Sequence, residues 1–246
     1  METNVFSFPK NVNLIEFLLK VGSQKDSIII DFFSGSGTTA NVTMELNNKD
    51  NGNRKFIMVQ ISEATDEKSE AFKAEYETIA EIGKERIRRA GDKIKSIYAT
   101  QSKMSSKEID IGFKVFKLDS SNLNKWNPDY NDIEQTILDS SDNIVVGRTE
   151  LDLTYEIMLK YGIDLTLAID EFSIGEWKIY SIGFGAFLIC LDDNITKEIA
   201  ISLIEKIKEL SPETVRIVFK DNGFRSDKTN IKESLKTIGI DEFITI

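Results

Sequence analysis

The stretch "SIIIDFFSGSGTTANVTMEL", residues 27 to 46, joins an apolar run to a helical pattern through a turn of small residues. The run is continuous rather than alternating, which is typical of a parallel strand covered on both faces, and it predicts a strand at about 27 to 31. Gly35 and Gly37 lie in the turn, and a helix is predicted from Gly37 to about Leu46. A glycine-rich turn before a helix brings the backbone close to a ligand at the helix N-terminus.

Further elements are predicted on both sides of this turn. A helix at about 11 to 21 precedes it, and the run "KFIMVQI" follows as a second strand, so that strand, helix and strand form a βαβ unit. A long helix is predicted from about 78 to 99. One of its stripes is apolar, formed by Ile79, Ile82, Ile87, Ala90, Ile94 and Ile97.

The opposite face of this long helix is basic. Such a face is either solvated or in contact with DNA or a partner. Its residues are Lys84, Arg86, Arg88, Arg89, Lys93 and Lys95.

The polar segment "TQSKMSSKE", residues 100 to 108, marks a predicted boundary between a domain at 1–100 and a second domain at 109–246. The second domain has strands separated by helices, which favours a mainly parallel sheet with one hairpin attached, and hence an α/β fold with a mixed sheet. In chain order its predicted elements are a strand "IDIGFKVFKL", a helix near 148 to 161, a hairpin from "LTLAID" into "EWKIYSI", a strand "AFLICL", a helix at 195 to 210, a strand "TVRIVF", a helix near 228 to 238 and a last strand "EFITI".

Composition excludes several classes of protein and site. Of 246 residues, 29% are charged, and no apolar run reaches the roughly 20 residues of a membrane span. The start "METNVFSFPK" lacks the pattern of a secretory signal, so we expect a cytoplasmic protein without a membrane partner. The absence of histidine excludes histidine triads and imidazole zinc sites. The net charge of -10 argues against a free-standing nucleic-acid binder. Cys190, the single cysteine, is expected in the core.

Three ligand classes compete for the turn. A phosphate-binding P-loop is excluded, because no lysine follows Gly37. A dinucleotide fits the spacing of Gly35, Gly37 and Ala40, but Asp31 at the strand end would repel its pyrophosphate and attract a cationic group. S-adenosylmethionine carries an ammonium and a sulfonium and has no phosphate. An NAD-dependent oxidoreductase, and an ordinary turn with Asp31 as a helix-capping acid, stay open as alternatives.

The motif "DFFSGSGTT" closely resembles the cofactor motif D-P-F-x-G-S-G-T-T of DNA amino-methyltransferases, with Phe32 in place of proline. The segment "FSFPKNVNLIEFLL" is similar to the family's segment at the methionine end of the cofactor, although Asn11 replaces a proline. The end of "NRKFIMVQIS" resembles the strand that meets the ribose, with Gln60 there. The resemblance implies a Rossmann-like S-adenosylmethionine-binding half-domain whose cofactor-binding residues are Phe8, Lys10, Asp31, Phe33, Ser34, Gly35, Gly37, Thr38, Thr39 and Gln60.

Later blocks such as "TIAEIGKERIRRAGDKI" and "YSIGFGAFLICLDDNIT" resemble the C-terminal half of modification (Mod) subunits of type III restriction-modification systems. This implies adenine-N6 methylation of DNA by the complete enzyme, a restriction (Res) subunit as partner, and a homodimer formed through the C-terminal domain. In the permuted family order, the catalytic turn Asp/Asn-Pro-Pro-aromatic precedes the cofactor motif. The nearest string here, "NPDY" at 127 to 130, follows that motif and has Asp129 in place of proline. We therefore assign no catalytic residue and expect the chain alone to be inactive, acting in cofactor binding or as an interaction module.

Overall fold

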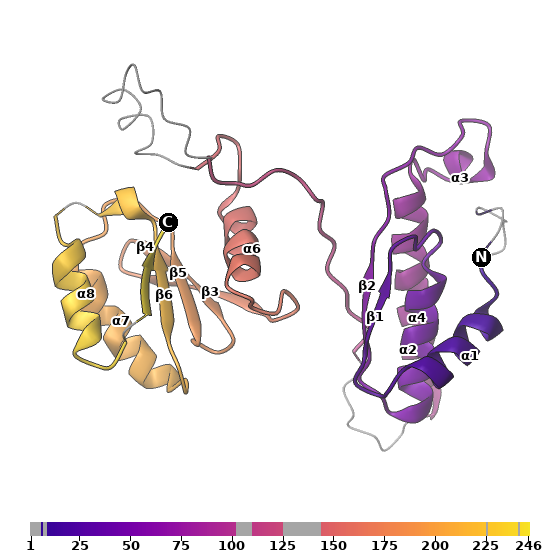
Figure 1. The fold of residues 1–246 in the computed structure, drawn as a ribbon, viewed down its shortest axis with the longest axis horizontal. Coiled ribbons are helices and arrows are strands. Elements are labelled where there is room, and N and C mark those ends of the chain that lie inside the picture. Colours follow the sequence, from indigo (N-terminus) through magenta and orange to yellow (C-terminus); the bar gives the residue numbers. More distant parts are fainter. Residues whose placement is uncertain (1–5, 7–8, 102–109, 125–143, 225, 241) are drawn as a thin grey trace. The chain divides into compact units, whose positions relative to one another are not determined.

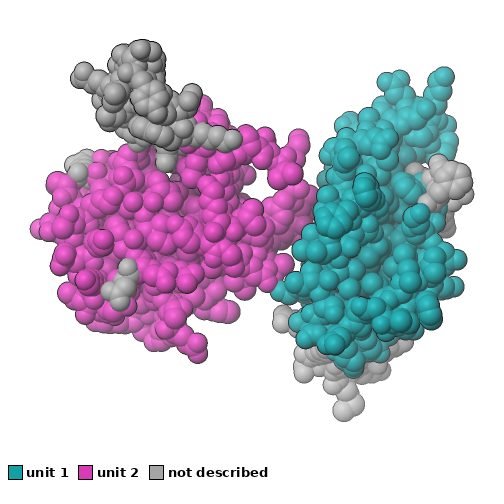
Figure 2. Space-filling model, viewed as in Figure 1, with its two compact units in different colours: residues 1–113 teal, residues 114–246 magenta. Residues whose placement is uncertain are grey.

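The computed structural model describes residues 6, 9–101, 110–124, 144–224, 226–240 and 242–246. The chain divides into two compact units, Met1–Phe113 and Lys114–Ile246, which are coloured separately in Figure 2. Each unit combines helices with a sheet, so the predicted α/β class is confirmed. Within the described ranges, no helix has both the length and the apolar composition that a membrane crossing requires.

The first unit contains the predicted βαβ arrangement (Figure 1). Strands β1 and β2 pair in parallel, with Ile30 opposite Ile57. Two strands do not define a strand order, so the Rossmann-like arrangement stays a prediction. The elements are α1 (Val12–Gly22), β1 (Ile28–Asp31), α2 (Thr38–Asp50), β2 (Lys55–Met58), the short and unpredicted α3 (Glu70–Lys73), and α4 (Ile79–Gln101).

Helices α2 and α4 pack against one face of the β1–β2 sheet. Ala40 and Met44 of α2 meet Ile87 and Ile94 of α4 in a buried cluster, and Phe56 of β2 packs against it. Side chains alternate between the two faces along a strand. The other face therefore carries every second residue, and these are exposed: Ile28, Ile30, Ile57 and Val59, called here the open apolar face.

Helix α1 is amphipathic yet has no buried residue. Its N-terminus is capped by Asn11, whose Oδ1 accepts hydrogen bonds from the backbone N–H groups of Asn13 and Leu14. Asparagine at this place, where the related motif has proline, is therefore explained by capping. The exposed apolar residues of α1 recur at helical spacing: Leu14, Phe17, Leu18 and Val21.

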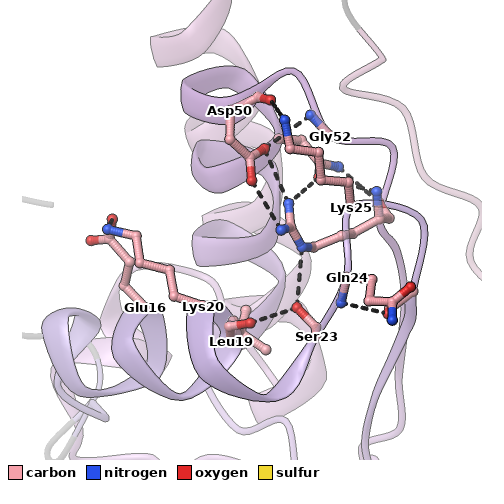
Figure 3. A network of polar contacts seen from close by, with 11 residues as sticks. Glu16, Leu19, Lys20, Ser23, Gln24, Lys25, Asp50 and Gly52 are labelled. Carbon is pink, nitrogen blue, oxygen red and sulfur yellow. Dashed lines mark hydrogen bonds and ion pairs between the residues drawn. The ribbon is translucent and has the colours of Figure 1, made fainter.

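A buried arginine joins α1, α2 and β2 just before β2 begins. The Arg54 side chain is only 4% exposed, and its Nη2 lies 2.9 Å from Asp50 Oδ2 at the end of α2. Its Nε donates to Ser23 Oγ at 3.1 Å, directly after α1. Asp50 also accepts from the backbone N–H of Gly52, so the turn into β2 is fixed as well (Figure 3).

The second unit is built on a five-stranded mixed sheet in the order β3-β4-β5-β6-β7. Strands β3, β4 and β5 are antiparallel, whereas β5, β6 and β7 are parallel, which confirms the topology of a hairpin attached to a parallel sheet. The first strand of the hairpin, predicted at "LTLAID", begins four residues later than predicted, at Ile169. The elements are α6 (Glu150–Lys160), β3 (Ile169–Ile174), β4 (Trp177–Ile182), β5 (Phe187–Cys190), α7 (Lys197–Leu210), β6 (Arg216–Phe219), the 3-10 turn Asp221–Gly223, α8 (Lys228–Lys236) and β7 (Glu242–Thr245).

Helices cover both faces of this sheet (Figure 1). Residues of α7 and α8 pack on one face, in a cluster that includes Cys190, so the predicted burial of this cysteine is confirmed. Helix α6 packs on the other face through Leu153 and Ile157. Its Glu156 accepts hydrogen bonds from Ser121 Oγ and from the backbone N–H of Asn122, which fastens the preceding segment to α6.

The predicted strand "IDIGFKVFKL" is wrong, because residues 110 to 118 form no strand. Three of their apolar side chains contact neighbouring helices instead, whereas Val115 and Leu118 are exposed. Ile111 lies against Gly91 of α4, and Phe113 packs on the cluster between α2 and α4. Phe116 meets the ring of Tyr155 edge-on at 4.9 Å. The first unit therefore extends to Phe113, beyond the predicted limit of 100. The string "NPDY" lies outside the described residues.

Candidate functional site

The turn between β1 and α2 forms a loop of residues 32–37, called here the glycine loop. Gly35 and Gly37 have positive φ values of 50° and 72°, a conformation that costs little only for glycine. Gly37 is the N-cap residue of α2 and supplies no side-chain cap. Among the described residues, the first N–H groups of α2 therefore have neither an intrahelical partner nor a capping side chain, which is the usual state of an anion-binding helix end.

Asp31 accepts hydrogen bonds from the glycine loop and from the first turn of α2. Its Oδ1 accepts a hydrogen bond from the backbone N–H of Phe33 at 3.1 Å, and its Oδ2 accepts from Thr39 Oγ1 at 2.6 Å. The carboxylate thus joins the strand end to the first turn of α2 through a side chain rather than through the helix backbone. Each carboxylate oxygen can still accept a further donor, so Asp31 is able to hold an ammonium group as well.

The end of β2 lies beside the same loop. The carbonyl of Val59 accepts from Ser34 N–H at 3.2 Å. Gln60 Oε1 accepts from Gly35 N–H at 2.7 Å, and Gln60 Nε2 donates to the carbonyl of Ile61. Gln60 therefore contributes to the shape of the loop in this structure, and its contact with a ribose stays a prediction.

Arg86 of α4 donates hydrogen bonds to the side chains on both sides of Gly37. Its Nη1 donates to Ser36 Oγ at 2.8 Å and to Thr38 Oγ1 at 2.9 Å. Burial lowers the pKa of Arg86, although the nearby charge of Glu45 acts in the opposite direction. The backbones also meet closely, because a Cβ added to Gly37 would lie 3.1 Å from the carbonyl oxygen of Gly83 on α4.

The prediction that Arg86 lies on a solvated face is wrong, because this side chain is half-buried and hydrogen-bonded to Ser36 and Thr38. Contact of the basic face with DNA or a partner stays a prediction. The other basic residues of α4 fit a solvated face, since Lys84 pairs with Glu81 and Arg89 with Glu85. Arg86 lies four residues after Ile82 and four before Ala90, both of which are buried. This spacing places Arg86 at the edge of the buried stripe, and it is the signal in the sequence that could have identified it.

The remaining predicted site residues are placed as follows. Phe33 is 88% exposed at the tip of the loop. Lys10 is exposed two residues before α1 begins, and within the described residues no hydrogen bond or ion pair joins it to the loop. Phe8 lies outside the described residues. The structure thus brings together the other eight: Asp31, Phe33, Ser34, Gly35, Gly37, Thr38, Thr39 and Gln60.

No cluster of three or more carboxylate or thiol side chains suited to a metal occurs among the described residues. Two shallow cavities lie in the second unit, one lined by Phe172, Ser202 and Lys206, the other by Leu167 and Arg216. Neither of these two cavities is lined by residues of the glycine loop.

Comparison with known proteins agrees with this geometry. Residues 2–70, which contain the glycine loop, match the family model described as DNA methylase. The chain is 31% identical over 245 residues to the Mod subunit of the type III restriction-modification enzyme EcoP15I of Escherichia coli, covering 96% of this chain and 34% of that subunit. The chain is related in sequence to type III Mod subunits.

Two further Mod subunits extend this relationship. The EcoPI subunit of Escherichia phage P1 is 30% identical over 238 residues, 95% of this chain and 35% of its own length. The StyLTI subunit of Salmonella typhimurium is 43% identical over 115 residues, 46% of this chain and 17% of its own length. The chain spans about a third of the length of the first two curated Mod relatives it matches. The resemblance stated from the sequence is confirmed.

Proposed function

We propose that this chain binds S-adenosylmethionine at the glycine loop, as part of an enzyme that methylates adenine N6 in DNA. One observation carries the proposal: Asp31 and the uncapped N-terminus of α2 lie at the two ends of the same loop. The methionine end of the cofactor has an ammonium and a carboxylate. Asp31 suits the ammonium, and the N–H groups of α2 suit the carboxylate. The pyrophosphate of NAD would instead lie against an anionic side chain.

The reaction itself needs groups that the sequence of this chain does not contain. In methyl transfer the adenine amine attacks the sulfonium methyl in line, a C–N bond forms, the C–S bond breaks, and a proton leaves the amine. Catalysis rests mostly on positioning the two reactants. The family positions the base with an Asp/Asn-Pro-Pro-aromatic turn. That tetrapeptide is absent from the 246 residues, so we expect no methyl transfer to duplex DNA by this chain alone.

Calorimetric titration of the full chain tests the cofactor assignment. S-adenosylmethionine or its demethylated product should bind and NAD should not. Asp31→Ala should weaken binding by about 1.5–3 kcal/mol, because it leaves the ammonium without its charged partner. Asp26→Asn, at an exposed carboxylate of the same unit, is the matched control.

A second control separates charge from loop geometry. Thr39→Val removes the 2.6 Å hydrogen bond to Asp31 and keeps the carboxylate, so it should weaken binding much less than Asp31→Ala. Binding of NAD without binding of S-adenosylmethionine would overturn the proposal. Radiolabelled methyl transfer that stays at background for this chain, and appears when the N-terminal half of a Mod subunit is added, is the expected outcome for activity.

The second unit is proposed to serve assembly in the cytoplasm, as a homodimer contact and as a docking site for the Res subunit. Strand β5 lies at the centre of its sheet, so "AFLICL" is not available to a partner. Strand β7, which contains "FIT", is an edge, and open edges pair with other chains. Light scattering of residues 109–246 beside the full chain should give a dimer mass. A monomer mass at all micromolar concentrations would remove this role.

A further inference from the structure

We propose that Arg86 is a positioning residue for the cofactor: it fixes the glycine loop in the shape that presents the first N–H groups of α2 to the ligand. This inference rests on the function proposed above. Arg86 reaches the loop from α4, 50 residues further along the chain. It lies outside residues 2–70, the segment that matches the DNA methylase model.

The first argument is the position of the two contacts on either side of Gly37. The same nitrogen, Nη1, donates to Ser36 before this glycine and to Thr38 after it. Glycine has access to both signs of φ, so an unrestrained chain could rotate at this residue. A guanidinium that holds both neighbours removes that freedom, and the Gly37 N–H stays directed at the Ser34 carbonyl at 2.8 Å.

The second argument is electrostatic. No carboxylate lies within ion-pair distance of Arg86 in the described part of the chain, whereas its neighbour Arg89 pairs with Glu85 at 2.7 Å. The charge of Glu45 acts on Arg86 from beyond ion-pair distance and only partly compensates its burial. A half-buried cation whose hydrogen-bond partners are neutral hydroxyls is less stable than a cation in water. Its charge also has the same sign as the N-terminal end of the α2 dipole. Both features favour an anionic group at the loop, and the carboxylate of the proposed cofactor is one.

The third argument is the close approach of the two backbones. Gly83, one turn before Arg86 on α4, leaves little room for a side chain, because an added Cβ would lie 3.0 Å from the carbonyl oxygen of Gly35. Gly83 and Arg86 thus both restrain the loop, Gly83 through close contact of the backbones and Arg86 through its two hydrogen bonds. A lysine could keep the charge at Arg86 but not the planar geometry of a guanidinium.

The test compares Arg86→Met and Arg86→Lys with Arg88→Met, a control on the same helix whose side chain is 53% exposed. Hydrogen exchange of the loop amides in the unliganded chain, and the calorimetric Kd for S-adenosylmethionine, are measured for each. We expect Arg86→Met to speed loop exchange and to weaken the Kd, each by about tenfold or more, with Arg86→Lys intermediate and Arg88→Met unchanged. Circular dichroism identifies any variant that fails to fold, and Arg86→Lys then carries the comparison.

A double-mutant cycle distinguishes positioning from general packing. In a Ser36→Ala, Thr38→Val background, Arg86→Met should have little further effect on the Kd, because the contacts through which it acts are already gone. An equal loss in both backgrounds, or Arg86→Met values that match those of Arg88→Met, would overturn the positioning role and leave cofactor binding untouched. If the wild-type chain binds no S-adenosylmethionine, the proposed function fails, and the exchange rates alone decide whether Arg86 orders the loop.

Discussion

Replacing Arg54 by methionine should destabilise the first unit more than any surface substitution. The guanidinium makes a two-pronged contact with Asp50, with Nη1 3.1 Å from Oδ1 and Nη2 2.9 Å from Oδ2. A third hydrogen bond reaches Ser23 at 3.1 Å. Methionine keeps the apolar stem of the side chain and removes all of these contacts.

The magnitude follows from burial. Removing one member of a buried ion pair costs about 3–5 kcal/mol, because the partner charge is left without compensation. The Asp50 side chain keeps 28% of its surface exposed and can recover some hydration, so we expect a loss at the low end, about 3 kcal/mol. Lysine keeps the charge but not the two-pronged geometry, and Arg54→Lys should cost about half as much.

The pH dependence adds a second signature. The hydrogen bond from Arg54 lowers the pKa of Asp50 below its ordinary value of 3.8, despite partial desolvation. An acid whose pKa is lower in the folded state contributes stability that is complete above its ordinary pKa and is lost as the pH falls through the folded value. The difference between wild type and Arg54→Met should therefore be constant at neutral pH and shrink below pH 3.8.

Urea unfolding resolves this effect by unit. Both tryptophans, Trp126 and Trp177, follow residue 113, so their fluorescence reports the second unit, whereas far-UV circular dichroism reports both. With a slope of about 1–2 kcal/mol per molar urea, a 3 kcal/mol loss moves the midpoint of the first unit by about 1.5–3 M. If the free energy of unfolding obtained from the dichroism transition falls by less than about 0.5 kcal/mol, which is the effect of ordinary surface substitutions, the reasoning is refuted.

Three further predictions use other contacts. Burial alone would raise the pKa of Glu156. The hydrogen bonds that its carboxylate accepts from Lys160, Ser121 and the backbone of Asn122 outweigh this effect and hold the pKa at about 2. Glu156→Gln should lower the free energy of unfolding of the second unit by about 1–2 kcal/mol, measured by urea unfolding with tryptophan fluorescence. The difference from wild type should become smaller as the pH falls from 4.5 towards 2. Gly37→Ala, at a φ of 72°, should lower the melting temperature of the first unit, whereas Gly22→Ala, with nothing within 4 Å, should not. Burial raises the pKa of Cys190 to about 12, so a thiol reagent should react with it only after unfolding.

Hydrophobic periodicity predicted most elements, because each buried face requires a regular apolar pattern. The buried run at β5 and the stripe of α4 at Ile82 and Ile87 are examples. The pattern failed where apolar residues pack without forming a strand, as Ile111 and Phe113 do on the first unit. A sequence gives the spacing of such residues but not whether a neighbouring strand offers backbone hydrogen bonds.

The candidate site was predictable in its residues but less so in its contacts. The motif around Asp31 located the glycine loop, whereas the charge of its ligand stays a prediction. That Asp31 also binds Thr39 depends on rotamers within the loop. The burial of Arg86 could be inferred from its spacing to Ile82 and Ala90. Its hydrogen bond to Ser36 joins residues 50 positions apart, and no local pattern contains it.

The open apolar face sets the colloidal behaviour of the isolated chain. Ile28 is 60% exposed and Ile30 51%, beside Ile57 at 49% and Val59 at 44%, so four aliphatic side chains of neighbouring strands meet water together. The net charge of -10 keeps molecules apart at pH 7, but this repulsion vanishes near the isoelectric point of about 4.8. High salt shortens the range of the repulsion while leaving the attraction between apolar faces. Preparations should therefore stay monodisperse in dilute, mildly alkaline, low-salt buffer, and acidification should precipitate the protein before it unfolds.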